Sequence, residues 1–157
     1  MTWPVAELDN VARLRILAAA QPSALFAEEV VDAPFDAVWA VAADLERELP
    51  VLLPDVRSMR ITAADGERLE GRARGYGGVR ARFDIVLRPG WCVMQSRFLL
   101  GGMAAVPDGG RTRFAFLGGF RFTGMRLLAP AVEPLVRGYG PLVIRRLRDR
   151  LEATPPA

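Results

Sequence analysis

The chain has 157 residues, of which 51% are hydrophobic, and 21 basic against 18 acidic residues give a formal net charge of +3. This length predicts one domain, and no apolar run reaches the roughly 18 residues of a membrane span, so we expect no stable membrane insertion. The sequence has no histidine and one cysteine, Cys92, which excludes Ser-His and Cys-His nucleophile pairs, an internal disulfide and a cysteine-cluster metal site.

We therefore expect neither a metal nor a cofactor, and we expect Cys92 to be a small core residue. The first residues lack the pattern of a secretory signal, which makes a cytoplasmic location the default prediction. All basic residues are arginines, as in a high-GC codon bias. They alternate along predicted strands with Glu67, Glu70 and Asp84 nearby, a pattern typical of a solvated sheet face, so we expect no nucleic-acid partner.

The first quarter of the chain predicts a helix, a strand and a second helical stretch. Apolar spacing predicts a helix over 4–20 and an apolar strand over 24–32. Asp32-Ala33-Pro34 then turns the chain into a helical stretch over 35–49, which Asp44 divides into two short helices.

Six segments with strand character follow. In the third of them Phe83 and Ile85 share one face while Arg82 and Asp84 share the other, which is typical of an antiparallel sheet covered on one side only. Gly101-Gly102 and Gly118-Gly119 lie within strand patterns and suggest bulges or sharp bends. The six predicted strands are 55–63, 67–74, 79–88, 91–99, 102–106 and 111–122.

The last predicted element is a long amphipathic helix over 129–152, which would cover the apolar face of the sheet. Its glycine and proline content predicts a kink near 138–141. The order of elements gives an α+β fold in which about seven antiparallel strands curve around this C-terminal helix.

Three stretches of sequence resemble the START-like (SRPBCC) helix-grip superfamily of polyketide cyclases and lipid-transfer proteins. They are Val31-Asp32-Ala33-Pro34 with Val38-Trp39 and Asp44, then Asp108-Gly109-Gly110-Arg111-Thr112-Arg113, then a terminal helix ending in Leu147 and Leu151-Glu152. The resemblance implies a helix-grip domain over 24–153. We expect a helical extension over 1–23 before it and a disordered tail over 154–157 after it.

The resemblance also implies a cavity between the concave sheet face and the last helix. An ordinary filled core is the alternative for the same residues. The apolar candidates for the cavity wall are Phe83, Ile85, Met94, Phe98, Phe114, Phe116, Phe120, Leu135 and Leu142.

An apolar lining predicts binding of an apolar small molecule, and the resemblance implies that this ligand could be polyketide-like. The enzymatic alternative is a metal-free polyketide cyclase or aromatase in which Tyr139, Arg60 and Ser96 supply the polar groups, with Tyr139 as proton donor. Against it, no buried acid-base pair is evident in the sequence. A third hypothesis is an interaction module with a filled core, in which the helix over 4–20 contacts a partner or forms a homodimer.

Overall fold

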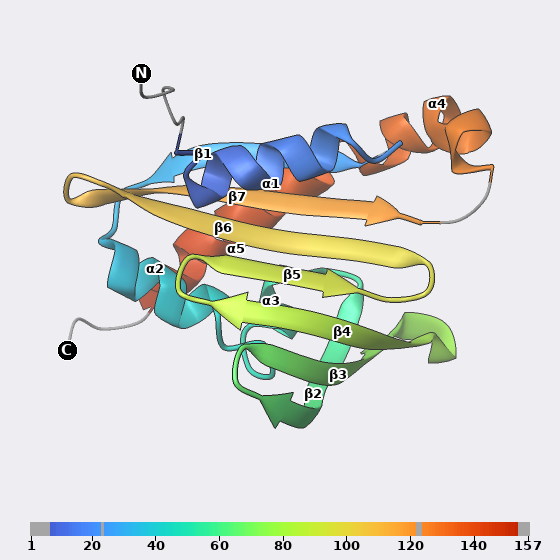
Figure 1. Cartoon of the computed structure of the whole chain (residues 1–157), viewed down its shortest axis with the longest axis horizontal. Helices are drawn as coiled ribbons and strands as arrows, with labels where there is room; N and C mark the ends of the chain where they lie inside the picture. Colours follow the sequence, from blue (N-terminus) through green and yellow to red (C-terminus); the bar gives the residue numbers. More distant parts are fainter. Residues whose placement is uncertain (1–6, 23, 122–123, 154–157) are drawn as a thin grey trace, which may run out of the picture.

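The computed structural model describes residues 7–22, 24–121 and 124–153 and confirms the α+β helix-grip architecture (Figure 1). Seven strands form one antiparallel sheet in the order β1-β7-β6-β5-β4-β3-β2. The strands are β1 (Leu25–Val31), β2 (Val56–Asp65), β3 (Arg68–Gly75), β4 (Arg80–Arg88), β5 (Trp91–Gln95), β6 (Leu99–Asp108) and β7 (Arg111–Phe120). The helices are α1 (Asn10–Ala19), α2 (Phe35–Ala42), α3 (Leu49–Leu52), α4 (Met125–Val136) and α5 (Tyr139–Ala153), with a 3-10 turn η1 (Tyr76–Gly78).

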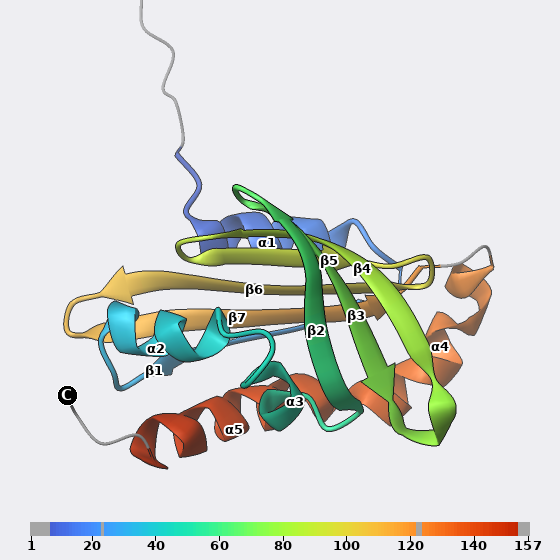
Figure 2. The ribbon, with the colours of Figure 1, turned by 90° about the horizontal axis from the view of Figure 1, so that it is seen from below.

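The concave face of the sheet holds the main core. β2 to β7 form a meander, and β1 pairs with β7 at the far edge. Helices α2, α3 and α5 lie on the concave face, and α1 lies on the opposite face (Figure 2). The centre of α5 supplies the fully buried residues Val143, Ile144 and Leu147, and Cys92 of β5 is fully buried among them as predicted.

The outer face of the sheet has a second, smaller core under α1. Val11, Leu14 and Ala18 of α1 pack there against Ala104 of β6 and Leu117 of β7. The prediction that the sheet is covered on one side only is therefore wrong for β5 to β7, although it describes β2 to β4. Small or apolar residues occupy both faces of these strands, and that pattern is typical of burial on two sides.

A hydrogen bond from a buried threonine joins the two turns that carried the family resemblance. The hydroxyl of Thr112 donates to the carbonyl oxygen of Ala33 at 2.8 Å, and Thr112 is fully buried. Because Val31 and Thr112 face each other in the β1–β7 ladder, the bond lies where β1 turns into α2. It ties the start of α2 to the sheet.

The predicted C-terminal helix is two helices, α4 and α5, which separate at Arg137 and Gly138. The break has a local cause, because Pro141 has no N–H to donate to the carbonyl of Arg137. The proline lies in the first turn of α5, where the missing N–H costs little. The kink expected near 138–141 is thus a complete interruption.

Three sequence-based expectations fall wholly or partly outside the described residues. These are the tail over 154–157, residues 4–6 of the helix predicted over 4–20, and the end of the strand predicted over 111–122. Within the described residues that helix begins at Asn10, with Asp9 as its N-cap, so the prediction of helix over 7–9 is wrong. Among the helices within the described ranges, none is long and apolar enough to span a bilayer.

Candidate functional site

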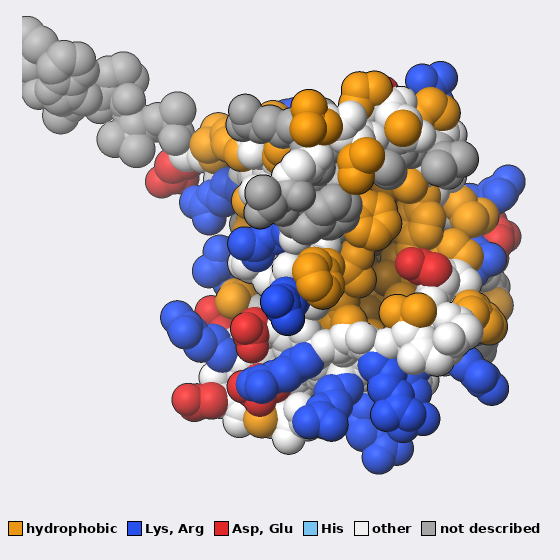
Figure 3. Space-filling model, turned by 90° about the vertical axis from the view of Figure 1, so that its right-hand side faces the viewer, with side chains coloured by type: hydrophobic (Ala, Val, Ile, Leu, Met, Phe, Trp, Pro, Cys, Tyr) orange, Lys and Arg blue, Asp and Glu red, His pale blue; other side chains and the backbone are white. Residues whose placement is uncertain are grey.

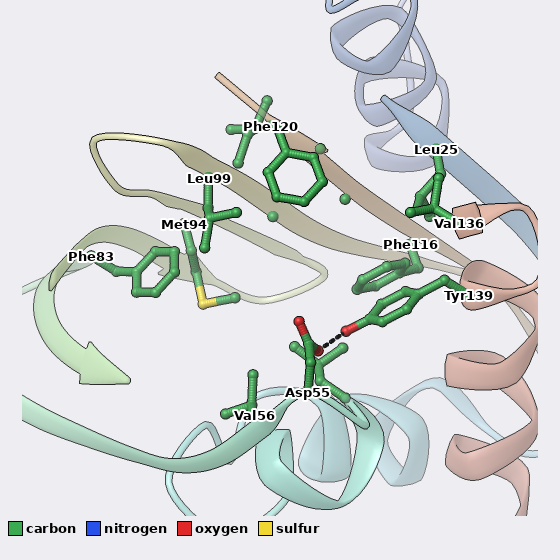
Figure 4. Close-up of a pocket in the computed structure, with 15 residues that line it drawn as sticks. Leu25, Asp55, Val56, Phe83, Met94, Leu99, Phe116, Phe120, Val136 and Tyr139 are labelled. Atoms are coloured by element: carbon green, nitrogen blue, oxygen red, sulfur yellow. Dashed lines mark hydrogen bonds between the residues drawn. The ribbon is translucent and has the colours of Figure 1, made fainter. Parts of the chain in front are cut away.

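A pocket of about 160 Å³ lies between the concave sheet face and the junction of α4 with α5 (Figure 4). Its wall is almost entirely apolar. It is lined by Leu25, Leu53, Asp55, Val56, Phe83, Met94, Leu99, Leu100, Gly101, Phe116, Gly118, Gly119, Phe120, Val136 and Tyr139.

The pocket stays open in part because glycines, which have no side chain, form part of its wall. Gly101 of β6 and Gly118 of β7 face each other directly in the ladder, and both border the pocket. The β6–β7 register is continuous from Leu99 to Phe120, so these glycines do not form the bulges that the sequence suggested. A Cβ atom at Gly101 would reach only ordinary van der Waals contact, 3.5 Å from Cε of Met94.

The polar side chains of the lining are Asp55 and Tyr139, which meet in a hydrogen bond. The Tyr139 hydroxyl donates to Oδ1 of Asp55, and the Tyr139 ring lies 5.8 Å from that of Phe116 (Figure 4). Burial, and secondarily the bond to Asp55, raises the pKa of Tyr139 well above its usual range. The phenol therefore stays protonated at neutral pH and acts as a donor. A ligand carbonyl or hydroxyl oxygen in the pocket could accept the hydrogen bond that Tyr139 otherwise donates to Asp55.

Five of the predicted site residues line the pocket: Phe83, Met94, Phe116, Phe120 and Tyr139. Six others do not border it, of which three lie in or near the core. Ile85 and Phe114 are buried in the main core, and Leu142 is half-buried on α5. The side chain of Leu135 lies outside the described residues.

Phe98 and Ser96 are in the turn after β5, which ends at Gln95 and not at residue 99 as predicted. Oγ of Ser96 accepts the backbone N–H of Leu99 at 2.9 Å, which shapes the turn and accounts for the serine. Phe98 is exposed, with the guanidinium of Arg97 5.2 Å from its ring centre. Neither residue borders the pocket.

Arg60 lies on the outer face of β2 and is exposed, whereas the preceding residue, Met59, is buried. Irregularities between Val56 and Ser58 and between Ile61 and Ala63 shift the β2 register. Alternation could not assign the faces of such a strand, because each bulge reverses the side on which later residues project.

Asp55 is the residue that sequence reasoning missed. It follows Pro54 just before β2 and is the first residue of the strand predicted over 55–63, where alternation alone gave no reason to single it out. In the part of the chain that the structure describes, no three His, Cys, Asp or Glu side chains gather as a metal site.

The chain has a START-like helix-grip fold, and solved structures with this fold match it along most of their length. The Zhui aromatase/cyclase from Streptomyces sp. R1128 superposes with a TM-score of 0.64 at 18% identity, covering 82% of this chain and 93% of that one. The protein TTHA0849 from Thermus thermophilus gives 0.63 at 22% identity, covering 83% and 97%. A START superfamily protein from Mycobacterium smegmatis gives 0.56 at 16% identity, covering 83% and 97%. No family model and no curated protein matches the sequence.

Proposed function

We propose that the protein binds an apolar or polyketide-like small molecule in the pocket between β4 to β7 and the α4–α5 junction. The observation that carries the proposal is an almost wholly apolar hollow with one hydrogen-bonding pair, Asp55 and Tyr139. Ligand sites typically combine an apolar wall with a few placed polar groups. Figure 3 shows hydrophobic side chains lining a hollow that is open at the surface.

The pocket volume limits the size of the ligand that can bind. A dry cavity of about 150 Å³ holds one benzene ring, and this pocket measures about 160 Å³. Drug-sized ligands usually need roughly 300 Å³ or more. We therefore infer that one ring or the end of an acyl chain occupies the pocket while the rest of the ligand lies in its open mouth.

Binding is tested by titrating the protein with Nile red, a neutral apolar fluorophore, and by native mass spectrometry of the protein as purified. The test variant is Gly101→Leu, whose side chain would fill the pocket without a clash at Cβ. We expect saturable fluorescence enhancement in the wild type and at least a tenfold loss of affinity in the variant.

Gly110→Leu is the matched control. It makes the same substitution in the β6–β7 turn, where a Cβ atom would meet nothing within 4 Å and the φ angle is not positive. The control should bind like the wild type. Equal binding by all three proteins would show that the dye does not use this pocket, and no binding by the wild type would favour the interaction module.

A second candidate function is metal-free cyclase or aromatase chemistry, which the convergence of Asp55 and Tyr139 favours. Tyr139 would donate its hydrogen bond to a ligand carbonyl, and the freed Asp55 carboxylate would take a proton from the adjacent carbon. The C–H electron pair then forms the enolate, which the phenol stabilises.

Proton abstraction is measured by NMR as exchange of the α-protons of an acetoacetyl thioester in deuterated buffer. We expect exchange above the buffer rate, loss of that excess in Asp55→Asn, and a reduction of roughly tenfold or more in Tyr139→Phe. Nile red binding by both variants is the control for an intact pocket. Exchange that is unchanged in Asp55→Asn would exclude this chemistry and leave ligand binding standing.

A further inference from the structure

Large exposed hydrophobic side chains gather at one end of the molecule. The first turn of α4, η1 and the β5–β6 turn all lie at the right-hand end of Figure 1. Leu127 on α4 is 87% exposed, Tyr76 in η1 64%, and Phe98 in the turn 53%. The same end carries the exposed residues Val79, Phe120 and Leu128.

The pocket opens at this same end of the molecule (Figure 3). Phe120 itself lines the pocket, as does Leu99, the neighbour of Phe98. The backbone N–H of Arg121 donates to the carbonyl of Phe98 at 2.6 Å, which holds the β5–β6 turn beside the end of β7. Viewed from this end, hydrophobic side chains border the hollow, and arginines gather on one side of it (Figure 3).

The arginines lie in cross-strand rows on the outer face of β3 and β4. Arg74 is directly opposite Arg80 on either side of η1, and Arg72 is opposite Arg82 in the next row. Glu70 pairs with Arg82 at 2.7 Å, but no carboxylate pairs with Arg74 or Arg80 within the described residues. Like charges directly opposite each other destabilise a sheet, and an anionic partner would relieve the repulsion.

The combination favours one class of partner. A nucleic acid would neutralise the arginines but offers nothing to leucines on a separate helix turn. A bilayer interface supplies phosphates and hydrocarbon at neighbouring depths, so it matches both the arginines and the exposed hydrophobic side chains. We call these exposed hydrophobic side chains the apolar rim. They come from several separate turns, and each turn can insert its side chains into the bilayer interface.

The geometry points to docking of this end on an anionic lipid bilayer, with the pocket mouth toward the membrane. The inference rests on the proposed ligand-binding function and adds the surface from which the apolar ligand enters. Docking of this kind leaves the chain peripheral, without insertion of a spanning segment.

The test is co-sedimentation of the full chain with phosphatidylcholine vesicles that contain or lack phosphatidylglycerol. We expect binding to the anionic vesicles that weakens with added salt. Arg74→Gln/Arg80→Gln should lower the partition coefficient roughly 25-fold, at about fivefold for each arginine near the surface. Leu127→Asp should lower it by roughly tenfold or more.

Two matched variants separate local docking from overall charge and hydrophobicity. Arg68→Gln/Arg111→Gln makes the same change in net charge at exposed residues beside the β2–β3 and β6–β7 turns. Ile16→Asp removes an exposed hydrophobic side chain from α1. Both should sediment like the wild type, and every variant should keep Nile red binding in vesicle-free solution.

Wild-type protein that binds Nile red but neither kind of vesicle would overturn the docking inference and leave the proposed function intact. Loss of sedimentation that is equal in the rim variants and the matched variants would also overturn it. Arginine-dependent binding to an immobilised polyglutamate peptide without vesicle binding would assign the surface to an acidic protein instead.

Discussion

Substitution of Thr112 should show how much its hydrogen bond stabilises the corner where β1 turns into α2. Thr112→Val keeps the shape but removes the donor to the partly buried carbonyl of Ala33, which costs about 1–3 kcal/mol. Urea unfolding measures the change. Thr62→Val is the control, because the exposed Thr62 hydroxyl is 3.3 Å from the carbonyl of Glu70 and its loss should stay within about 0.5 kcal/mol. Equal effects at both positions would contradict a special role for the corner.

Single residues also show where sequence-based reasoning about the site succeeds and fails. Phe83 and Met94 lie on strands with regular alternation, so their faces follow from parity, and both line the pocket. Arg60 lies between two irregularities of β2, where parity fails. Asp55 precedes its strand and becomes part of the site only because α5 brings Tyr139 to it, 84 residues later in the chain.

The junction of α5 with β1 depends on the absence of a side chain at Gly140. A Cβ atom there would lie 2.7 Å from Cβ of Ala27 and 3.4 Å from Cδ1 of Leu25. Gly140→Ala should cost about 1–3 kcal/mol through overpacking, which outweighs the roughly 1 kcal/mol gain in helix propensity. Thermal unfolding tests this.

Gly138→Ala is the control for the helix junction, because a Cβ atom at Gly138 would meet nothing within 4 Å. Its effect should be neutral or a small stabilisation from the lower entropy of the unfolded chain. A stabilised Gly140→Ala protein would mean that α5 can move away from β1.

At the scale of elements, alternation and turn residues predicted all seven strands, while two long-range features escaped prediction. Burial of the outer sheet face by α1 depends on which strands lie under the helix, and helical spacing alone does not reveal this. The division into α4 and α5 was predicted only as a kink. The glycines and Pro141 marked its place, but helical spacing did not show that the helix would end at Val136 and start again at Tyr139.

Two ion pairs link helices to distant parts of the molecule and should make its stability sensitive to acid. Glu48 accepts two hydrogen bonds from Arg150 of α5, both at 2.7 Å, and these hold the pKa of Glu48 below its usual value of 4.5. Asp9 accepts the backbone N–H of Ala12 at 2.8 Å and a bond from Arg113 of β7 at 2.6 Å. The first of these, followed by the second, lowers the pKa of Asp9 below 3.8.

Both carboxylates contribute stability above their unfolded pKa values, and the contribution is lost as the pH falls through the lower folded values. The free energy of unfolding should therefore decrease below about pH 4.5, by roughly 1 kcal/mol or less for each partly exposed pair. Urea titrations across this range measure the slope. Glu48→Gln/Asp9→Asn should flatten it, since Asn still caps α1. An unchanged slope would assign the acid sensitivity to other carboxyl groups.

Because Cys92 is completely buried, its reactivity reports how often the protein unfolds far enough to expose the centre of the sheet. The side chain is fully buried in β5, and burial raises the pKa of its thiol to about 12. The native thiol is therefore both shielded from reagents and held in its unreactive protonated form. The rate at which a thiol reagent modifies the protein is then set by the frequency of the unfolding events that expose Cys92. A ligand that stabilises the folded protein by filling the pocket should slow this modification. The measurement needs no introduced label.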